Sequence, residues 1–409
     1  MLPTNQRDVL RELADETMRL AALPVQRERI ALWKALNRGE MARPMVVMDQ
    51  LPWNELGCDE LTLRVTDPYW RGVEEQLRRQ LYQYRRFPVD MVIDPFISIP
   101  KVLRRTGFGL LPEVERIGKK DAINAQHFTN LLTCMDDVQK ITDDHITHDT
   151  SETDRRMQEA EALFGDIAPA RAKGETFFLG VWDYLSQIMG VQDAYLAMFD
   201  DPDLLHAALD RATCATIAAI EDANACGAHN DIGNTCHCSY IYCDDLLPDS
   251  GQGKGPRSEN CWSFGLAQLF SSVSPALFEE YELPYVTRMA PYFGALYYGC
   301  CDRLDDRLDV VKRIPRVRKV SCSPWSDRKN FAERIGTELI MSVKPSPAFL
   351  ATASFDEDAV REDIRLTCRL ARENNVNLEF ILKDVSTVQN EAERLTRWAN
   401  AVMEVVQGA

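Results

Sequence analysis

Residues 295–327 read ALYYGCCDRLDDRLDVVKRIPRVRKVSCSPWSD, and this stretch indicates an α/β fold. It holds two short apolar runs, at 295–299 and 318–321, with a segment of suitable length for a helical crossover between them. This order of run, helix and run is typical of parallel strands joined by a helix. Reactive polar residues follow each run directly, which is where parallel α/β folds carry their chemistry.

The same order continues in both directions along the chain. Further apolar runs lie near residues 45, 91, 177, 233, 340 and 380. Together the runs give eight strands alternating with helices, which predicts an α/β fold of the (β/α)8 TIM-barrel type. A doubly wound open sheet is the competing architecture, but no GxGxxG turn follows the first run. Helical spacing over 5–37 predicts an N-terminal helical extension at 1–43, followed by the barrel at 44–409.

Composition narrows the classes of partner. The 409 residues include 45% apolar and 27% charged residues, and no segment approaches the roughly 20 consecutive apolar residues of a membrane helix. The net charge of −16 repels nucleic-acid phosphates and anionic lipids, so we expect neither as a partner. The first residues, MLPTNQRDVLRELADETMRL, lack the apolar centre of a secretion signal. We therefore expect a cytoplasmic protein whose twelve cysteines are mostly reduced.

The residues that follow the apolar runs are the candidate site. They are Asp94, Trp182, His237, Cys300, Cys301, Asp302, Ser323, Trp325, Lys344, Lys383 and Asp384. Adjacent thiolates suit zinc, which in catalytic sites takes about three protein ligands and keeps one position open. Neighbouring residues of an extended segment point to opposite faces, so Cys300 and Cys301 reach one metal only if a turn follows Gly299. The alternative for these cysteines is ordinary packing.

Two lysines and two tryptophans are further candidates. Lys344 and Lys383 each follow an apolar run, where a lysine can bind an anionic substrate or act as a desolvated base. A solvated lysine at the rim is the alternative, although Asp384 beside Lys383 favours an ion pair or an acid–base pair. Trp182 and Trp325 would line a pocket for a ring-shaped or methylated substrate, unless they are plain packing residues.

Four segments carry a family resemblance. They are RERIALWKALNRGEMARP at 27–44, GVWDYLSQIMGVQDAYLAMFDDPDLLHAAL at 180–209, YYGCCDRLDDRLDVVKRIPRVRKVSCSPWSD at 297–327 and IMSVKPSPAFL at 340–350. From about residue 27 onward the chain resembles the uroporphyrinogen decarboxylase superfamily, in its decarboxylase-like branch near the corrinoid and coenzyme M methyltransferases. The resemblance implies a TIM barrel and makes a homodimer ordinary. The decarboxylase binds substrate carboxylates with an RQAGRY segment, which this sequence lacks.

The resemblance also implies a metal site. The methyltransferases of that superfamily bind zinc with a His-x-Cys pair after a late strand and a cysteine near the last strand. Here Tyr298 stands at the position of the histidine and Cys300 at that of the first cysteine. Lys383 or Asp384 replaces the last cysteine. The groups that would complete the metal site are Cys301, His237 or a carboxylate.

The leading hypothesis from the resemblance is a methyltransferase that moves a methyl group between a small methylated substrate and a corrinoid protein. Zinc would assist by lowering the pKa of the nucleophile. The predicted metal ligands are Cys300, Cys301 and His237; the predicted catalytic residues are Asp302, Lys383 and Asp384; the predicted substrate contacts are Asp94, Trp182, Tyr298, Ser323, Trp325 and Lys344.

Two other hypotheses remain open. One is a metal-free decarboxylase or lyase, in which Lys344, Lys383 and an aspartate stabilise and protonate a carbanion. The other is a non-catalytic barrel that binds a tetrapyrrole or corrinoid. A protein without zinc favours the decarboxylase, and tetrapyrrole binding without methyl transfer favours the non-catalytic barrel.

Overall fold

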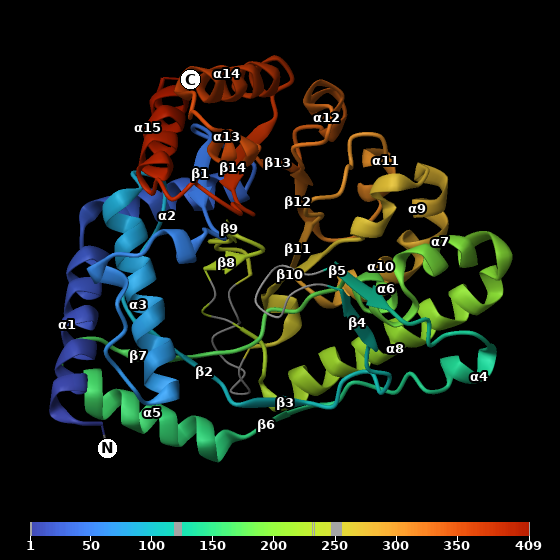
Figure 1. Cartoon of the computed structure of the whole chain (residues 1–409), viewed down its shortest axis with the longest axis horizontal. Coiled ribbons are helices and arrows are strands. Elements are labelled where there is room, and N and C mark those ends of the chain that lie inside the picture. Colours follow the sequence, from blue (N-terminus) through green and yellow to red (C-terminus); the bar gives the residue numbers. More distant parts are fainter. Residues whose placement is uncertain (1, 118–124, 231, 233, 247–255, 409) are drawn as a thin grey trace.

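The structure is a computed structural model that describes residues 2–117, 125–230, 232, 234–246 and 256–408 (Figure 1). Its helices are α1 (Thr4–Ala21), α2 (Pro24–Asn37), α3 (Pro68–Arg86), α4 (Met135–Val138), α5 (Thr150–Phe164), α6 (Val181–Met189), α7 (Val191–Asp200), α8 (Pro202–Cys226), α9 (Pro275–Tyr281), α10 (Leu283–Met289), α11 (Leu308–Val311), α12 (Arg328–Ile335), α13 (Ala348–Ala351), α14 (Glu357–Glu373) and α15 (Glu393–Gln407). Its strands are β1 (Met45–Met48), β2 (Ile97–Pro100), β3 (Leu103–Arg105), β4 (Val114–Ile117), β5 (Ala125–Phe128), β6 (Ile146–His148), β7 (Ala170–Lys173), β8 (Thr235–Cys236), β9 (Ser239–Tyr240), β10 (Trp262–Gly265), β11 (Ala295–Tyr298), β12 (Val317–Cys322), β13 (Ile340–Val343) and β14 (Asn377–Leu382).

The centre of the fold is a six-stranded parallel sheet. Its strand order is β1-β14-β13-β12-β11-β10, and helices such as α12 and α14 connect successive strands. The mixed α/β class is therefore confirmed, and five predicted strands, near 45, 296, 319, 340 and 380, lie in this sheet. The other strands of the described residues pair in two-stranded sheets, so the pairing does not show closure into an eight-stranded barrel.

The predicted strand near residue 91 does not form, and the side chain of Asp90 gives a physical reason. Its Oδ2 accepts a hydrogen bond from the backbone amide of Val46 at 2.9 Å, while its Oδ1 lies 2.6 Å from Arg43 Nη2. A buried carboxylate thus occupies an amide of β1 that a neighbouring strand would use. The amide of Asp90 still donates to the carbonyl of Val46 at 3.0 Å, so the segment runs beside β1 without forming a ladder.

The predicted strand near residue 177 is reduced to isolated parallel bridges, one at Phe178 and one just before it at Glu175, which pairs with His229. Phe178 pairs with Phe264 of β10 and extends the hydrogen bonding one step beyond the sheet. Strand β10 itself was not predicted from the sequence, because it has four residues with a serine among them, too short a signal to separate from a loop.

The strand predicted near residue 233 includes residues 231 and 233, which lie outside the described residues, and over 235–240 it differs from the prediction. The chain forms the antiparallel hairpin β8–β9, in which Thr235 pairs with Tyr240. Its two central residues, His237 and Cys238, have φ angles of 48° and 69°. Positive φ at both positions is the geometry of a type I′ turn, which normally takes Asn and Gly. The dipeptide His237–Cys238 is not typical of such a turn, so the amino-acid sequence did not predict the hairpin.

The two faces of the sheet differ in chemistry because side chains alternate along a strand. One face packs beneath helices with the apolar residues Val46, Leu296, Val320, Met341 and Phe380. The opposite face carries the fully or almost fully buried residues Tyr297, Lys319, Ser321, Ser342 and Glu379. Trp33 of α2 and Tyr240 of β9 belong to the apolar cluster that covers part of this second face. The polar residues are therefore enclosed, and we call this side the inner face.

The predicted N-terminal helical region consists of two helices that break before Pro24. Helix α1 packs with α3 and α5 around a separate core that contains Leu10, Trp70 and Phe164, on the left and lower side of Figure 1. Helix α2 instead contributes Trp33 to the sheet. None of the helices in the described part of the chain combines the length and apolar character that a bilayer crossing requires.

Candidate active site

The chain turns sharply after β11 and brings two cysteines together. Gly299 has a φ of 89°, and the Sγ atoms of Cys300 and Cys301 lie 3.6 Å apart. The amide of Cys300 donates to Asp302 Oδ1 at 2.6 Å, and Ser321 Oγ donates to the Cys300 carbonyl at 2.6 Å. The turn that the sequence required for adjacent thiols to face one site is therefore present, and Asp302 holds it in place.

A substitution at Gly299 tests this turn. A Cβ at this position would lie 2.5 Å from Leu304 Cδ1 and 3.1 Å from Ser321 Cβ, in a φ region that favours glycine. We expect Gly299→Ala to lower the free energy of unfolding by about 1–3 kcal/mol, measured by urea denaturation. The matched control is Gly72→Ala in α3, where no atom lies within 4 Å of the added Cβ and stability should not fall. Equal losses in both variants would contradict the assignment.

The end of β14 completes the cluster around the cysteines. Lys383 Nζ donates to Cys300 Sγ at 3.0 Å and lies 3.4 Å from Asp384 Oδ2. The same carboxylate oxygen accepts a hydrogen bond from Cys301 Sγ at 3.3 Å. Four predicted site residues thus meet from segments 83 positions apart in sequence, because the carboxyl ends of parallel strands lie at one edge of the sheet.

The contacts set the charge of these groups. The hydrogen bond with Cys301, the His237 ring and the Lys383 ammonium together hold the pKa of Cys300 well below its ordinary value, although burial acts in the opposite direction. The hydrogen bond to Cys300 raises the pKa of Cys301. Burial would lower the pKa of Lys383, but the hydrogen bond and charge of Cys300 raise it. The contact with Lys383 Nζ at 3.0 Å thus favours the thiolate form of Cys300, which is the reactive form of cysteine.

The hairpin tip presents His237 to the same cluster. Its ring stacks on Phe264 with centroids 5.0 Å apart, and the ring of Tyr297 lies at 5.1 Å. Burial lowers the pKa of His237, so the imidazole is neutral at physiological pH. Its Nε2 is buried without a hydrogen-bond partner among the described residues. A left-handed backbone at a non-glycine residue costs about 1–3 kcal/mol and clusters at functional sites, which favours a role for this turn.

A second buried lysine lies on the inner face. Lys344 Nζ donates to Ser342 Oγ at 2.9 Å and also to the hydroxyl of Tyr297, which in turn bonds Ser342 Oγ at 2.7 Å. Burial lowers the pKa of Lys344 to about 8. This lysine can therefore give or take a proton near neutral pH. Tyr297 and Ser342 were not predicted as site residues. The period of two along each strand could have identified Ser342, since it lies two residues before Lys344.

That same period places Tyr298, a predicted substrate contact, on the opposite face of the sheet from Ser342 and Lys344. The Tyr298 side chain points to the face beneath the helices, where its hydroxyl donates to Glu282 Oε1 at 2.8 Å. Trp182 is also a core residue: it lies within α6, is fully buried, and donates from Nε1 to the carbonyl of Tyr281 at 3.0 Å. Neither side chain contacts the cysteine cluster in the described residues. Plain packing, the alternative for Trp182, is what the structure has.

The remaining predicted residues lie apart from the cysteines. Asp94 accepts a hydrogen bond from the hydroxyl of Tyr242 at 2.7 Å and lines a separate cavity of 160 Å³. Burial raises the pKa of Asp94 to about 6. Ser323 is buried with its Oγ 3.3 Å from Ser326 Oγ, and Trp325 is 77% exposed. The structure therefore brings together the cysteines, His237 and the lysines. It does not place Asp94, Ser323 or Trp325 with them, so these three substrate contacts stay predictions.

The donors around Cys300 can be compared with what zinc requires. Two sulfur atoms and the unpartnered Nε2 of His237 are suitable types of donor. However, the Lys383 ammonium contacts Cys300 at 3.0 Å, and no three His, Cys, Asp or Glu side chains in the described ranges are grouped to hold a metal. This arrangement does not fit a zinc ion. Zinc stays a prediction of the sequence resemblance.

The protein thus has an α/β fold with the Cys300–Lys383 pair where parallel strands end. Comparison with solved structures finds a similar chain, a methyltransferase from Methanosarcina mazei, with 14% sequence identity and a TM-score of 0.50. The alignment covers 91% of this chain and 97% of that chain, so the likeness extends over the whole fold. No protein-family model matches the sequence, and no curated protein matches it. At this identity the likeness is one of fold.

Proposed function

We propose that this protein is a methyltransferase that moves a methyl group between a small methylated substrate and a corrinoid carried by a partner protein. The observation that carries the proposal is the buried Cys300 Sγ, which lies 3.0 Å from Lys383 Nζ at the carboxyl ends of the strands. The name of the structural neighbour and the sequence resemblance support the same class of reaction.

The residues supply a balanced route for the first transfer. The Cys300 thiolate attacks the methyl carbon, a sulfur–carbon bond forms, and the bond from carbon to the leaving atom breaks with its electron pair on that atom. Lys344, hydrogen-bonded to Tyr297, gives its proton to the leaving atom when that atom carries negative charge. The product on the enzyme is S-methylcysteine at position 300.

The second transfer returns the cysteine to its starting state. The corrinoid supplies the electron-rich acceptor of the methyl group when its carrier protein is bound. As the methyl group leaves Cys300, the electron pair stays on sulfur, and the Lys383 ammonium and Cys301 thiol stabilise the thiolate that re-forms. These contacts to Cys300 act on negative charge, which is the charge that develops on sulfur in this step.

The test is a methyl-transfer assay under anaerobic conditions with free reduced cobalamin as the acceptor. A panel of methylated amines, thioethers and methyl aryl ethers is screened, and methylcobalamin is followed by visible absorption. We expect turnover with one class, loss of at least about a thousandfold in Cys300→Ala, and a gain of one methylene mass at Cys300 before the acceptor is added. The covalent route would be overturned if Cys300→Ala still turned over. It would also be overturned if Cys300 showed no mass gain after substrate is added without acceptor.

Metal content distinguishes a zinc-assisted methyl transfer from the metal-free route through Cys300. Elemental analysis compares protein purified without oxygen or chelator with the double variant Cys300→Ser, Cys301→Ser. About one zinc per wild-type chain and none in the variant would show that zinc binding depends on the two cysteines. Zinc in neither protein would leave the thiolate as the nucleophile.

A metal-free decarboxylase is the second candidate, and the two buried lysines favour it. Lys344 and Lys383 are both 3% exposed, and paired cations of this kind can stabilise a carboxylate or carbanion. Release of carbon dioxide from an added carboxylate, without methyl transfer to cobalamin, would select this function.

A further inference from the structure

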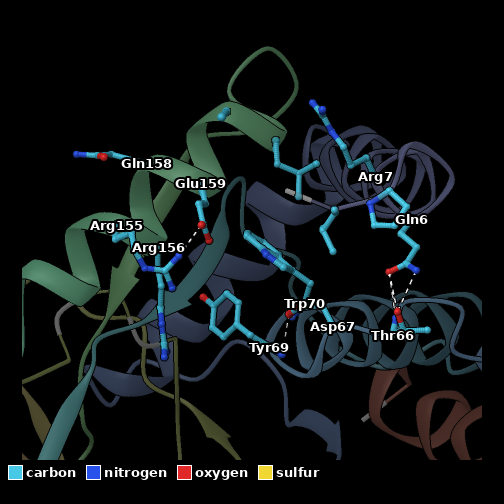
Figure 2. Close-up of a pocket in the computed structure, with 14 residues that line it drawn as sticks. Gln6, Arg7, Thr66, Asp67, Tyr69, Trp70, Arg155, Arg156, Gln158 and Glu159 are labelled. Atoms are coloured by element: carbon cyan, nitrogen blue, oxygen red, sulfur yellow. Dashed lines mark hydrogen bonds and ion pairs between the residues drawn. The ribbon is translucent and has the colours of Figure 1, made fainter.

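A large groove lies between the N-terminal helices, away from the cysteines. Its volume is about 1060 Å³, and its walls come from the first turn of α1, the first turn of α3 and one side of α5. Figure 2 shows Tyr69 and Trp70 between the two walls, with Arg7 on one wall and Arg155 and Arg156 on the other. Small-molecule sites usually measure about 300–1,000 Å³, so the groove has room for a whole ligand.

The base of the groove is aromatic. Trp70 is 6% exposed, and its ring meets that of Tyr69 edge to face with centroids 5.1 Å apart. The aliphatic residues Leu163 and Leu2 line the same space. A flat apolar group placed here would gain contact on aromatic and aliphatic carbon, as in typical ligand pockets.

The lining carries three arginines against two carboxylates, Asp67 and Glu159, in a chain whose net charge is −16. The backbone amide of Arg7 donates to the carbonyl of Pro3 at 3.0 Å, but its guanidinium makes no hydrogen bond or ion pair with any described residue. Arg156 uses Nε on Glu152 at 3.0 Å, and its guanidinium carbon lies 4.6 Å from the Tyr69 ring centre. Arg155 is committed to Glu152 and Glu159. Two guanidinium groups, on opposite walls, thus keep donors available for an anion.

Two further features favour an anionic group. Helix α1 begins at the groove with no side chain capping its first amides, so its positive end is open to a ligand. The hydroxyl of Tyr69 is buried without a hydrogen-bond partner among the described residues, and burial raises the pKa of Tyr69, so the group keeps its proton. If a ligand oxygen moved the Arg156 guanidinium away from the Tyr69 ring, that oxygen could also accept a hydrogen bond from the Tyr69 hydroxyl.

We propose that this groove is a second binding site, separate from the cysteine cluster, for an organic anion with a flat apolar body. The carboxylate or phosphate of the ligand lies between Arg7 and Arg156, and the apolar body lies over Trp70. The site needs no reaction at Cys300, so it stands whether or not the proposed methyl transfer is correct.

The experiment is calorimetric titration of the full chain with 1-naphthoate and with its neutral analogue 1-naphthalenemethanol. We expect one naphthoate per chain, bound at least about tenfold more tightly than the alcohol, since a hydrogen bond to a charged group is worth about that factor. Arg7→Gln and Arg156→Gln should each weaken naphthoate binding by about five- to tenfold and leave the alcohol unchanged. Tyr69→Phe should weaken it severalfold.

The matched control is Arg27→Gln, which removes an exposed arginine of α2 that does not line the groove. We expect it to bind naphthoate like the wild type. Equal affinities for the acid and the alcohol, no binding up to millimolar naphthoate, or equal effects of Arg7→Gln and Arg27→Gln would each overturn the proposal. Because the Arg7 guanidinium has no partner among the described residues, Arg7→Gln should leave the urea denaturation midpoint unchanged, which separates loss of binding from a folding defect.

Discussion

Alkylation of Cys300 by iodoacetamide is expected to change by less than about twofold between pH 6 and pH 8, whereas free cysteine speeds up by about 75-fold. The factor for free cysteine follows from an ordinary thiol pKa of about 8.5, which gives about 0.3% thiolate at pH 6 and about 24% at pH 8. The pKa of Cys300 is lowered by Cys301, His237 and Lys383, so its thiolate persists as the pH falls. Peptide mass spectrometry assigns the modified residue.

The change in alkylation rate with pH is the quantity to compare, because burial of Cys300 slows alkylation by the same factor at every pH. Cys300 is 6% exposed, so its absolute rate can be lower than that of free cysteine. Lys383→Met removes an ammonium 3.0 Å from the sulfur and should restore part of the dependence on pH, while Lys383→Arg should retain most of the wild-type profile. A wild-type slope equal to that of free cysteine would contradict the thiolate assignment.

The sequence contained enough information to bring the cysteines and lysines together. Cys300, Lys344 and Lys383 each follow a strand of one parallel sheet, and a parallel sheet places all its carboxyl ends at one edge. This prediction follows from the strand topology alone and requires no interatomic distance. The turn after Gly299 was a condition that the sequence left open, and glycine accepts the positive φ that the chain adopts there.

The sequence did not reveal the features that depend on neighbours far along the chain. The choice between Tyr297 and Tyr298 depends on the register of β11, which only its pairing with β10 and β12 fixes. The tip of the β8–β9 hairpin uses His237 where turn chemistry would favour asparagine or glycine, so no local rule predicts it. The groove between α1, α3 and α5 arises from helix packing, which a sequence pattern does not place.

Lys319→Met is expected to lower the free energy of unfolding by about 3–5 kcal/mol, measured by urea denaturation at pH 7. Lys319 and Glu379 are both fully buried on the inner face, with Nζ and Oε2 2.7 Å apart. Nζ also donates to Ser239 Oγ at 2.6 Å and to the carbonyl of Tyr240 at 3.0 Å. The variant would leave the Glu379 carboxylate buried without its cation, and its Oε1 already lacks a partner among the described residues.

The double variant Lys319→Met, Glu379→Leu separates loss of the pair from loss of one charge. Replacing both groups with apolar side chains removes the unpaired carboxylate, so most of the lost stability should return. Arg288→Met, which breaks an exposed pair with Asp210, is the control and should cost no more than about 1 kcal/mol. If the single and double variants were equally unstable, the packing of the lysine stem would be the cause instead. Because Lys319 ties β9 to β12 and β14, the single variant should also release the hairpin that presents His237 to Cys300 and reduce activity more than Arg288→Met does.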